Sequence, residues 1–202
     1  MRTILFTFVI LYTSIHIMAQ NTRSAEDANG LTVGVKAPVF QAIDADSVIF
    51  KLAQALKTGP IVLIFYRGHW CPICNKHLGA VQDSLKFITD RGATVVAISP
   101  EKPEYLEKMA DKTGAAFRLL YDEGYTIADA YDVTFTPGKR QMIMYNTFLN
   151  ANLKKTHSDD SQRLPIPATY IISSEGNIVW RQFDPDYHKR STVKDILDNL
   201  PR

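Results

Sequence analysis

The chain has 202 residues, of which 46% are apolar and 22% are charged. This length and composition predict one globular domain with a sizeable core and exclude a disordered or fibrous chain. The formal net charge is only +2, so there is no electrostatic case for a nucleic-acid partner, and we expect none.

The first twenty residues are typical of an export signal. Arg2 precedes an apolar run at 4–12, and the small residue Ala19 offers a cleavage site. The run is shorter than the roughly 20 apolar residues of a membrane-spanning helix, which makes a retained anchor the weaker alternative. We therefore expect a signal peptide at 1–19, a polar leader at 20–34, and a mature protein that is exported, either periplasmic or secreted.

The rest of the chain alternates between strand and helix patterns. Unbroken apolar runs such as 61–66 indicate strands buried on both faces, whereas apolar residues three or four apart indicate amphipathic helices. The expected elements are an edge strand at 47–51, a buried strand at 61–66, a helix from the cysteines to Gly92, a strand at 93–99, a helix from Pro103 to about 112, a strand at 117–121, a helix at about 125–131, a hairpin of strands 168–173 and 178–183, and a last helix at about 192–200. This order predicts an α/β domain with a mixed central sheet flanked by helices.

The chain contains only two cysteines, Cys71 and Cys74. Exported proteins often use disulfides as structural links, but a bridge across two residues closes a tiny loop and removes little unfolded-state entropy. Because side chains at positions i and i+3 of a helix are neighbours, the two sulfurs can bridge reversibly. The spacing therefore favours a reactive dithiol.

The cysteines lie where a buried strand ends and a helix begins, which is where open α/β sheets place their chemistry. Pro72 suits the first turn of that helix, because its missing N–H has no partner there in any case. The free N–H groups of the helix start stabilise a thiolate, and Arg67 and His69 can add positive charge.

Two cofactor interpretations are weaker. A zinc site would use His69, Cys71, Cys74 and His77, but structural sites usually draw their ligands from separate segments. Covalent haem attachment would need a histidine directly after the second cysteine, where Asn75 stands. We expect no metal and no cofactor, and we interpret His69 as a loop residue and His77 as an exposed helix residue.

Four segments resemble the peroxiredoxin-like branch of the alkyl hydroperoxide reductase/thiol-specific antioxidant family. They are V-G-V-K-A-P-V-F (33–40), F-Y-R-G-H-W-C-P-I-C-N (65–75), V-V-A-I-S-P-E (95–101) and P-A-T-Y-I-I (167–172). The resemblance implies a thioredoxin-like fold over 35–202 and an antioxidant that reduces peroxides through a Cys71/Cys74 dithiol–disulfide cycle. It implies supporting roles for Arg67, Trp70, Pro72 and Pro167. It also implies a peroxide or protein-disulfide substrate and an external, thioredoxin-like thiol reductant.

The departures from the family pattern keep a second function open. In typical peroxiredoxins a Thr or Ser stands three residues before the attacking cysteine, and here that position is Cys71. The family's active-site arginine falls on Pro167, where thioredoxin has a cis-proline, so we expect a cis Ile166–Pro167 bond beside the dithiol. Thioredoxin's buried acid falls on the apolar Ile64. A thioredoxin-like disulfide oxidoreductase is therefore the alternative to a thiol peroxidase.

The roles of the sulfurs follow from the same comparison. An ungapped alignment places the attack on Cys74, but we expect Cys71 to attack, since it precedes the helix and should be the more exposed thiolate. A copper-binding protein of the thioredoxin fold is a non-enzymatic alternative, because soft thiolates bind Cu(I). Its third ligand would be His157 or His188, which are otherwise interpreted as surface residues.

Residues 135–163 interrupt the fold before the Pro167 strand. They combine an amphipathic pattern at 141–149 with a polar tract at 154–162. This insertion is interpreted either as a packed surface excursion, as a flap over the dithiol, or as the surface of a homodimer, in which exposed methionine and aromatic side chains would help.

Overall fold

A computed structural model describes residues 23–201. The expected signal peptide at 1–19 and the start of the leader lie outside the described residues. Among the residues that are described, no helix has the length and apolarity needed to cross a bilayer.

The described chain alternates between strands and helices, as the sequence predicted. In chain order its elements are η1 (Ala25–Asp27), β1 (Gln41–Ile43), β2 (Ile49–Lys51), α1 (Leu52–Ala55), β3 (Ile61–Phe65), α2 (Pro72–Asp83), α3 (Leu85–Thr89), β4 (Thr94–Ser99), α4 (Pro103–Thr113), β5 (Arg118–Tyr121), η2 (Glu123–Tyr125), α5 (Thr126–Ala130), β6 (Thr134–Phe135), α6 (Lys139–Ile143), η3 (Met144–Phe148), α7 (Leu153–Thr156), β7 (Leu164–Pro165), β8 (Ala168–Ile172), β9 (Ile178–Phe183) and α8 (Val193–Asn199).

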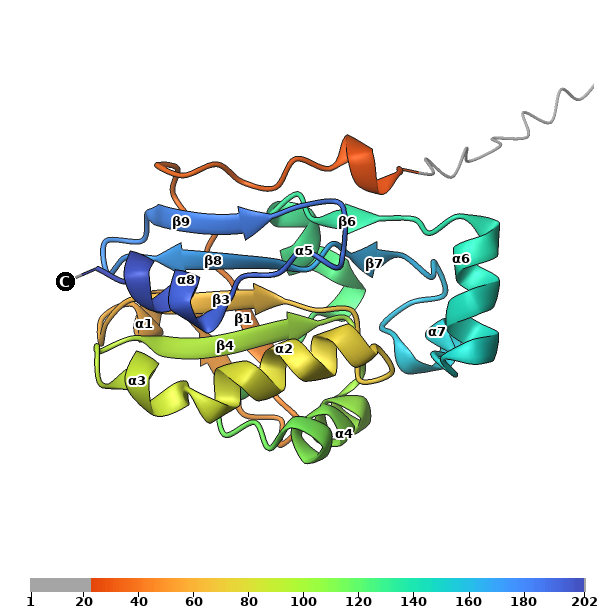
Figure 1. Ribbon diagram of the computed structural model, residues 1–202, viewed down its shortest axis with the longest axis horizontal. Coiled ribbons are helices and arrows are strands. Elements are labelled where there is room, and N and C mark those ends of the chain that lie inside the picture. The colour runs from red at the N-terminus through yellow and green to blue at the C-terminus, as the bar shows by residue number, and fades with distance from the viewer. Residues whose placement is uncertain (1–22, 202) are drawn as a thin grey trace, which may run out of the picture.

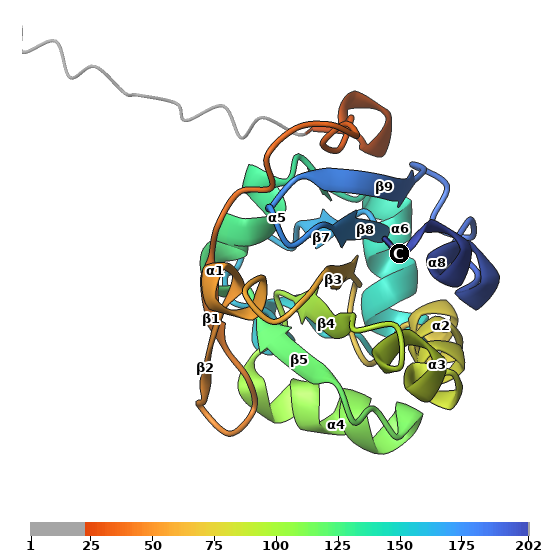
Figure 2. The same cartoon turned by 90° about the vertical axis from the view of Figure 1, so that its left-hand side faces the viewer.

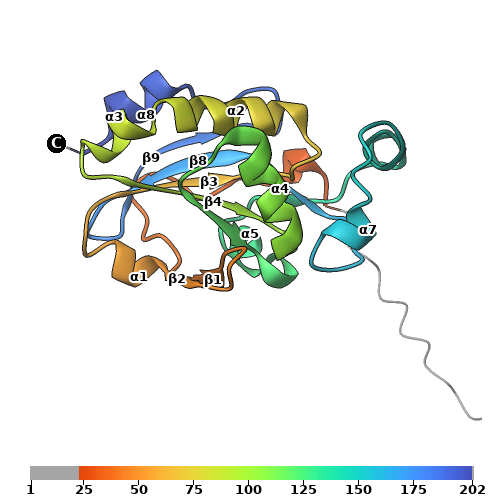
Figure 3. The ribbon, with the colours of Figure 1, turned by 90° about the horizontal axis from the view of Figure 1, so that it is seen from below.

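The central sheet has the strand order β5-β4-β3-β8-β9 (Figure 1). Strands β3, β4 and β5 are parallel, β8 is antiparallel to β3, and β9 is antiparallel to β8. Helices α2, α3 and α8 cover one face, and α1, α5 and the β1–β2 hairpin cover the other (Figures 2 and 3). This arrangement confirms the expected thioredoxin-like α/β fold with a mixed sheet.

Strand β3 is the apolar run predicted at 61–66, and its two buried faces explain its place at the centre of the sheet. Its side chains alternate between the two faces, so Val62 and Ile64 pack under α2, while Leu63 and Phe65 enter the core beneath α5. All of them are fully buried. A strand that is covered on both faces needs apolar residues at every position, and this fixes β3 in the middle of the sheet.

Two details of the prediction are wrong. The helix expected to run from the cysteines to Gly92 breaks at Ser84, which separates α2 from α3. The peptide bond before Pro167 is trans, as are all the described peptide bonds. The chain reaches Pro167 in an extended path, because β7 pairs with β6 and the Ile166 N–H donates to the Val133 carbonyl.

The described part of the leader packs against the domain. Ala28 is only 3% exposed. The Asp132 carboxylate accepts hydrogen bonds from the Arg23 side chain and from the Asn29 N–H, while the Leu31 N–H donates to the Tyr170 hydroxyl. The leader is therefore fastened to the domain from Arg23 onward.

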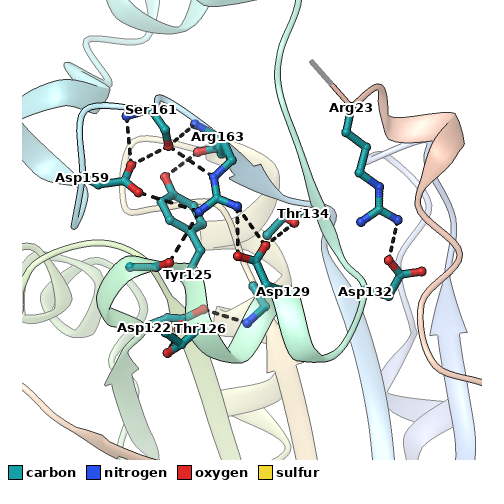
Figure 4. A network of polar contacts seen from close by, with 12 residues as sticks. Arg23, Asp122, Tyr125, Thr126, Asp129, Asp132, Thr134, Asp159, Ser161 and Arg163 are labelled. Atoms are coloured by element: carbon teal, nitrogen blue, oxygen red, sulfur yellow. Dashed lines mark hydrogen bonds and ion pairs between the residues drawn. The ribbon is translucent and has the colours of Figure 1, made fainter. Parts of the chain in front are cut away.

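The insertion at 135–163 forms α6, η3 and α7 at one end of the sheet (Figure 1). The pairing of β6 with β7 closes its base. A polar network also ties the base to α5 (Figure 4): the Arg163 guanidinium donates to both Asp129 oxygens, at 2.9 and 3.0 Å, and the Tyr125 hydroxyl donates to the Arg163 carbonyl. These contacts hold the insertion in one place relative to the sheet.

His157 belongs to this anchor, so its interpretation as a surface residue is wrong. Its ring is completely buried, and Nδ1 lies 2.9 Å from the Tyr125 hydroxyl. Burial lowers the pKa of His157 to about 3. The folded state therefore holds this imidazole neutral, whereas His188 is exposed, as expected.

We expect replacement of His157 to reduce the fall in the free energy of unfolding as the pH is lowered. The unfolded imidazole takes up a proton near pH 6.5 and the folded one near pH 3, so this residue's contribution is complete above pH 6.5 and is lost as the pH falls. Between pH 7 and pH 4 the free energy of unfolding should fall by on the order of 3 kcal/mol less in His157→Gln than in the wild type, while the loss from other buried groups remains. Urea unfolding at both pH values measures it.

His188→Gln is the matched control and should keep the wild-type pH dependence, because that ring is solvated. A His157→Gln protein whose free energy of unfolding falls as steeply as that of the wild type would contradict the assignment.

Candidate active site

The dithiol lies at the carboxyl end of β3 and the start of α2, as the sequence predicted. Cys71 is the N-cap residue of α2, Pro72 is its first residue, and Cys74 is in its first turn. The strand delivers the chain to this edge, and the proline begins the helix without leaving an N–H unpaired. Both sulfurs therefore lie at the positive end of the helix.

The two sulfurs are in contact and are shielded from solvent. Both cysteines are free, their Sγ atoms are 2.8 Å apart, and the residues are 0% and 1% exposed. The expectation that Cys71 is the more exposed sulfur is wrong, because the turn after β3 and the insertion cover it. At this separation one thiol can donate a hydrogen bond to the other sulfur once that sulfur is ionised.

Arg67 is the cation of the site, and it is only 2% exposed. Its Nη2 donates to Cys71 Sγ at 3.1 Å, and its Nη1 donates to the Tyr145 hydroxyl at 3.0 Å. Its guanidinium carbon lies 4.0 Å from the centre of the Tyr187 ring, 5.1 Å from that of Tyr145 and 5.3 Å from that of Trp70. Arg67 and Trp70, both singled out from the sequence, therefore contact each other, and Arg67 also contacts Cys71.

Tyr145 comes from the insertion, which therefore reaches the dithiol. Its ring packs on Trp70 with centroids 5.2 Å apart, and the residue is 1% exposed. This contact supports the interpretation of the insertion as a flap over the site. The exposed apolar residues of the same segment point elsewhere: Ile143, Met144 and Phe148 are 60%, 42% and 79% exposed.

A second arginine approaches the pair from the opposite end of the chain. Arg190 Nη2 lies 3.6 Å from Cys74 Sγ, and its Nε donates to the Tyr187 carbonyl at 2.7 Å. Both residues belong to the loop between β9 and α8, which we call the 184–190 loop. No motif or periodicity in the sequence marks this loop, because its proximity to Cys74 depends on the fold of the terminal hairpin.

The charges around the pair favour a thiolate on Cys74. Burial opposes its ionisation, but the Cys71 hydrogen bond, Arg190 and Arg67 together hold the pKa of Cys74 well below the ordinary thiol range. The hydrogen bond with Cys74, together with burial, raises the pKa of Cys71 well above that range. The neutral Cys71 thiol then donates to the Cys74 thiolate.

The two nearby histidines are held by other residues. His69 Nδ1 lies 2.7 Å from the buried carboxylate of Glu101, and the His69 N–H donates to the same carboxylate at 2.7 Å. His77 Nε2 lies 3.1 Å from the Ser191 hydroxyl, and burial together with Arg190 lowers the pKa of His77 to about 4. The expectation of a loop position is confirmed for His69, whereas the expectation that His77 is exposed is wrong.

Among the residues singled out from the sequence, the structure gathers Arg67, Trp70 and Pro72 around the Cys71/Cys74 pair. Pro167 is buried ahead of β8. Sequence reasoning assigned no role in the site to four residues from other segments, one of which ends the family-like segment 95–101. They are Glu101, Tyr145, Tyr187 and Arg190.

We expect Arg190→Gln to raise the pH at which the reduced protein forms its thiolate. An opposite charge at this range lowers a pKa by about 1 to 3 units, so its loss should raise the midpoint by about one unit. Titration of thiolate absorbance in the ultraviolet measures it. Lys189→Gln removes a neighbouring charge that is paired with Asp184 and exposed, and it should leave the midpoint unchanged. Equal midpoints in the wild type and Arg190→Gln would contradict the role of Arg190.

Comparison with known proteins identifies the family. Residues 33–181 match the AhpC/TSA family. A putative peroxiredoxin of Mycobacterium tuberculosis is 31% identical over 148 residues, which cover 73% of this chain and 90% of that protein. Peroxiredoxin Bcp of Bacillus subtilis is 24% identical over 170 residues, which cover 83% of this chain and 96% of that protein.

A solved structure shows the same fold. The crystal structure of peroxidoxin BcpB from Mycobacterium tuberculosis has a TM-score of 0.64 and 21% sequence identity, with 84% of this chain and 96% of that chain covered. The family match spans most of the chain, including both cysteines and the arginine before them. The chain belongs to the AhpC/TSA family and is a thiol-dependent peroxidase of the peroxiredoxin type.

Proposed function

We propose that this protein reduces hydroperoxides with Cys74 as the attacking thiolate and Cys71 as the resolving thiol. Cys74 Sγ attacks one peroxide oxygen, an S–O bond forms as the O–O bond breaks, and the leaving alkoxide takes up a proton to become an alcohol. The Cys71 sulfur then attacks the Cys74 sulfenic acid. The disulfide forms, and the released hydroxide takes the Cys71 proton to become water.

One observation carries this assignment: the two buried Sγ atoms lie 2.8 Å apart, and Arg190 Nη2 approaches Cys74 Sγ from the other side, at 3.6 Å. Arg190 and Arg67 are both within reach of the pair and can stabilise the negative charge that develops on the peroxide oxygen. The family pattern would have a Thr at 71 and an arginine at 167, and this chain has Cys71 and Pro167 there, so the positive charge comes from other positions. The assignment reverses the roles expected from the sequence, which rested on an exposed Cys71.

The burial of both sulfurs favours a small substrate. A protein disulfide must bring its own sulfur into line with the attacking thiolate, whereas a hydroperoxide needs room for only a few atoms. The Tyr145 and Tyr187 rings, which flank Arg67, would have to move before a protein could reach the dithiol. Disulfide exchange remains the second candidate, supported by two cysteines spaced C-x-x-C at a helix N-terminus.

The cysteine variants test the roles. We expect Cys71→Ser to react with one equivalent of hydroperoxide and to retain a sulfenic acid on Cys74, because nothing resolves it. We expect Cys74→Ser to lose peroxide consumption by at least about a thousandfold, since the nucleophile is gone. Stopped-flow consumption of hydrogen peroxide, with mass analysis of the trapped product, measures both.

The same preparations should be assayed for reduction of a protein disulfide. Rapid peroxide consumption with slow protein-disulfide reduction is the expected pattern. The reverse pattern would favour the oxidoreductase, and a sulfenic acid on Cys71 in Cys74→Ser would return the attack to Cys71.

We further propose that a thioredoxin-like dithiol restores the reduced pair. This step is an exchange in which the donor's two thiols become a disulfide.

We also propose that a second copy of this chain covers the exposed apolar side chains of the insertion. Sedimentation equilibrium measures the oligomeric state, and a monomer throughout the micromolar range would count against the dimer.

Export is the last proposal, and it rests on the pattern at 1–19. Expression of the full chain in a bacterium should give a periplasmic protein that begins at residue 20. Intact mass and fractionation measure this. Replacement of three apolar residues in the 4–12 run by Asp should leave the unprocessed chain in the cytoplasm, and full-length protein in the periplasm would rule out cleavage.

A further inference from the structure

Glu101 is a completely buried carboxylate that the steps above do not use. It lies two residues after the end of β4, and both of its oxygens face His69. Isolating a carboxylate from water is costly, and replacing such pairs with apolar residues is often neutral or stabilising. Stability therefore gives little reason to keep an acid at this position.

The turn after β3 is built around this acid. A Cβ at Gly68 would lie 2.6 Å from Glu101 Oε1 and 2.5 Å from Trp70 Nε1, so only glycine leaves room for the carboxylate. The His69 N–H also donates a hydrogen bond to this carboxylate. Trp70 Nε1 is buried and has no hydrogen-bond partner among residues 23–201. The turn after β3 therefore directs the Arg67 guanidinium toward the dithiol. The residues that follow Arg67 in the same turn hold the Glu101 carboxylate.

The turn that holds Glu101 leads directly into Cys71 at the start of α2, so the buried carboxylate belongs to the same site as the dithiol. Burial raises the pKa of Glu101, hydrogen bonds from His69 oppose this, and the charge of Cys74 raises it further. Tyr66, at the end of β3, senses both groups: burial raises the pKa of its hydroxyl, and the charges of Glu101 and Cys74 add to the effect. Since electrostatic coupling is reciprocal, an ionised Glu101 must disfavour the Cys74 thiolate by the same free energy.

The groups around Cys74 act on its ionisation in opposite directions. Cys71 from α2, Arg67 from the turn after β3 and Arg190 from the 184–190 loop favour its ionisation. Glu101, after β4, opposes it. The nucleophilicity of a thiolate falls as its pKa falls, so two arginines and a thiol donor by themselves would give a fully ionised but weak nucleophile.

We propose, building on Cys74 as the attacking thiolate, that Glu101 is a positioning residue whose carboxylate, held by His69, offsets the two arginines and keeps the Cys74 thiolate reactive. His69 holds the acid in place, and its partly exposed ring gives the pair a proton connection to solvent. Glu101 does not contact the sulfurs. It acts through their ionisation.

The test is a thiolate titration of Cys74 alone. In the Cys71→Ser background, where the hydroxyl still donates to Cys74, we expect Glu101→Gln to lower the thiolate midpoint by about one unit, because a like charge is removed. At a pH above both midpoints, the rate with hydrogen peroxide should fall about threefold. Glu101→Asp keeps the charge and should restore most of both values.

Glu104→Gln is the matched control, since Glu104 is an exposed acid three residues further along, and it should shift neither value. A merely structural Glu101 would lower the melting temperature of Glu101→Gln and leave the midpoint where it was. That outcome overturns the proposal.

A second measurement needs no substitution at Glu101. Carboxyl carbon chemical shifts should give Glu101 a lower pKa in Cys74→Ser than in the reduced wild type, because the thiolate charge is gone. Equal values would overturn the proposal even if Glu101→Gln failed to fold. Neither titration needs peroxidase turnover, so a protein that shifts as expected but consumes no peroxide would refute the proposed function and not this inference.

Discussion

Arg67 is a charged side chain with almost no exposed surface, and the site around it is arranged to compensate for the water it has lost. Cys71 Sγ and the Tyr145 hydroxyl accept its hydrogen bonds, and the rings of Trp70, Tyr145 and Tyr187 surround its guanidinium. A buried guanidinium tolerates this place only while its partners remain. It therefore fixes the dithiol, the insertion and the 184–190 loop relative to one another.

This constraint explains how the protein can lack two groups that its family ordinarily uses. The cysteine at 71 removes the hydroxyl that would contact a peroxide, and Pro167 removes an arginine. Arg190 supplies positive charge from a different element, 3.6 Å from Cys74. A cation can act on a sulfur from any direction, so Arg190 can favour the Cys74 thiolate although it lies outside the family motif.

The cysteine at position 71 also places the second sulfur of the pair. With Cys71 at the N-cap of α2, three residues ahead of Cys74, the two sulfurs already touch, so no helix must unfold to form a disulfide between them. The cost is an enclosed site, because the insertion and the 184–190 loop cover both sulfurs. Substrate size and the motion of these two segments then govern access to the dithiol.

The sequence by itself determined the order of strands and helices along the chain, the cysteine pair, its place at the start of α2 and the closeness of Arg67 and Pro72 to it. Each of these depends on residues close together in the chain, through apolar periodicity, helix capping or the i, i+3 spacing. Only the tertiary structure decided the burial of Cys71, the approach of Arg190, Tyr145 and Glu101, the trans bond at Pro167 and the burial of His157. Those features depend on contacts between segments far apart in sequence, and neither the charge nor the burial of a side chain can be read from its own neighbours when distant elements supply its surroundings.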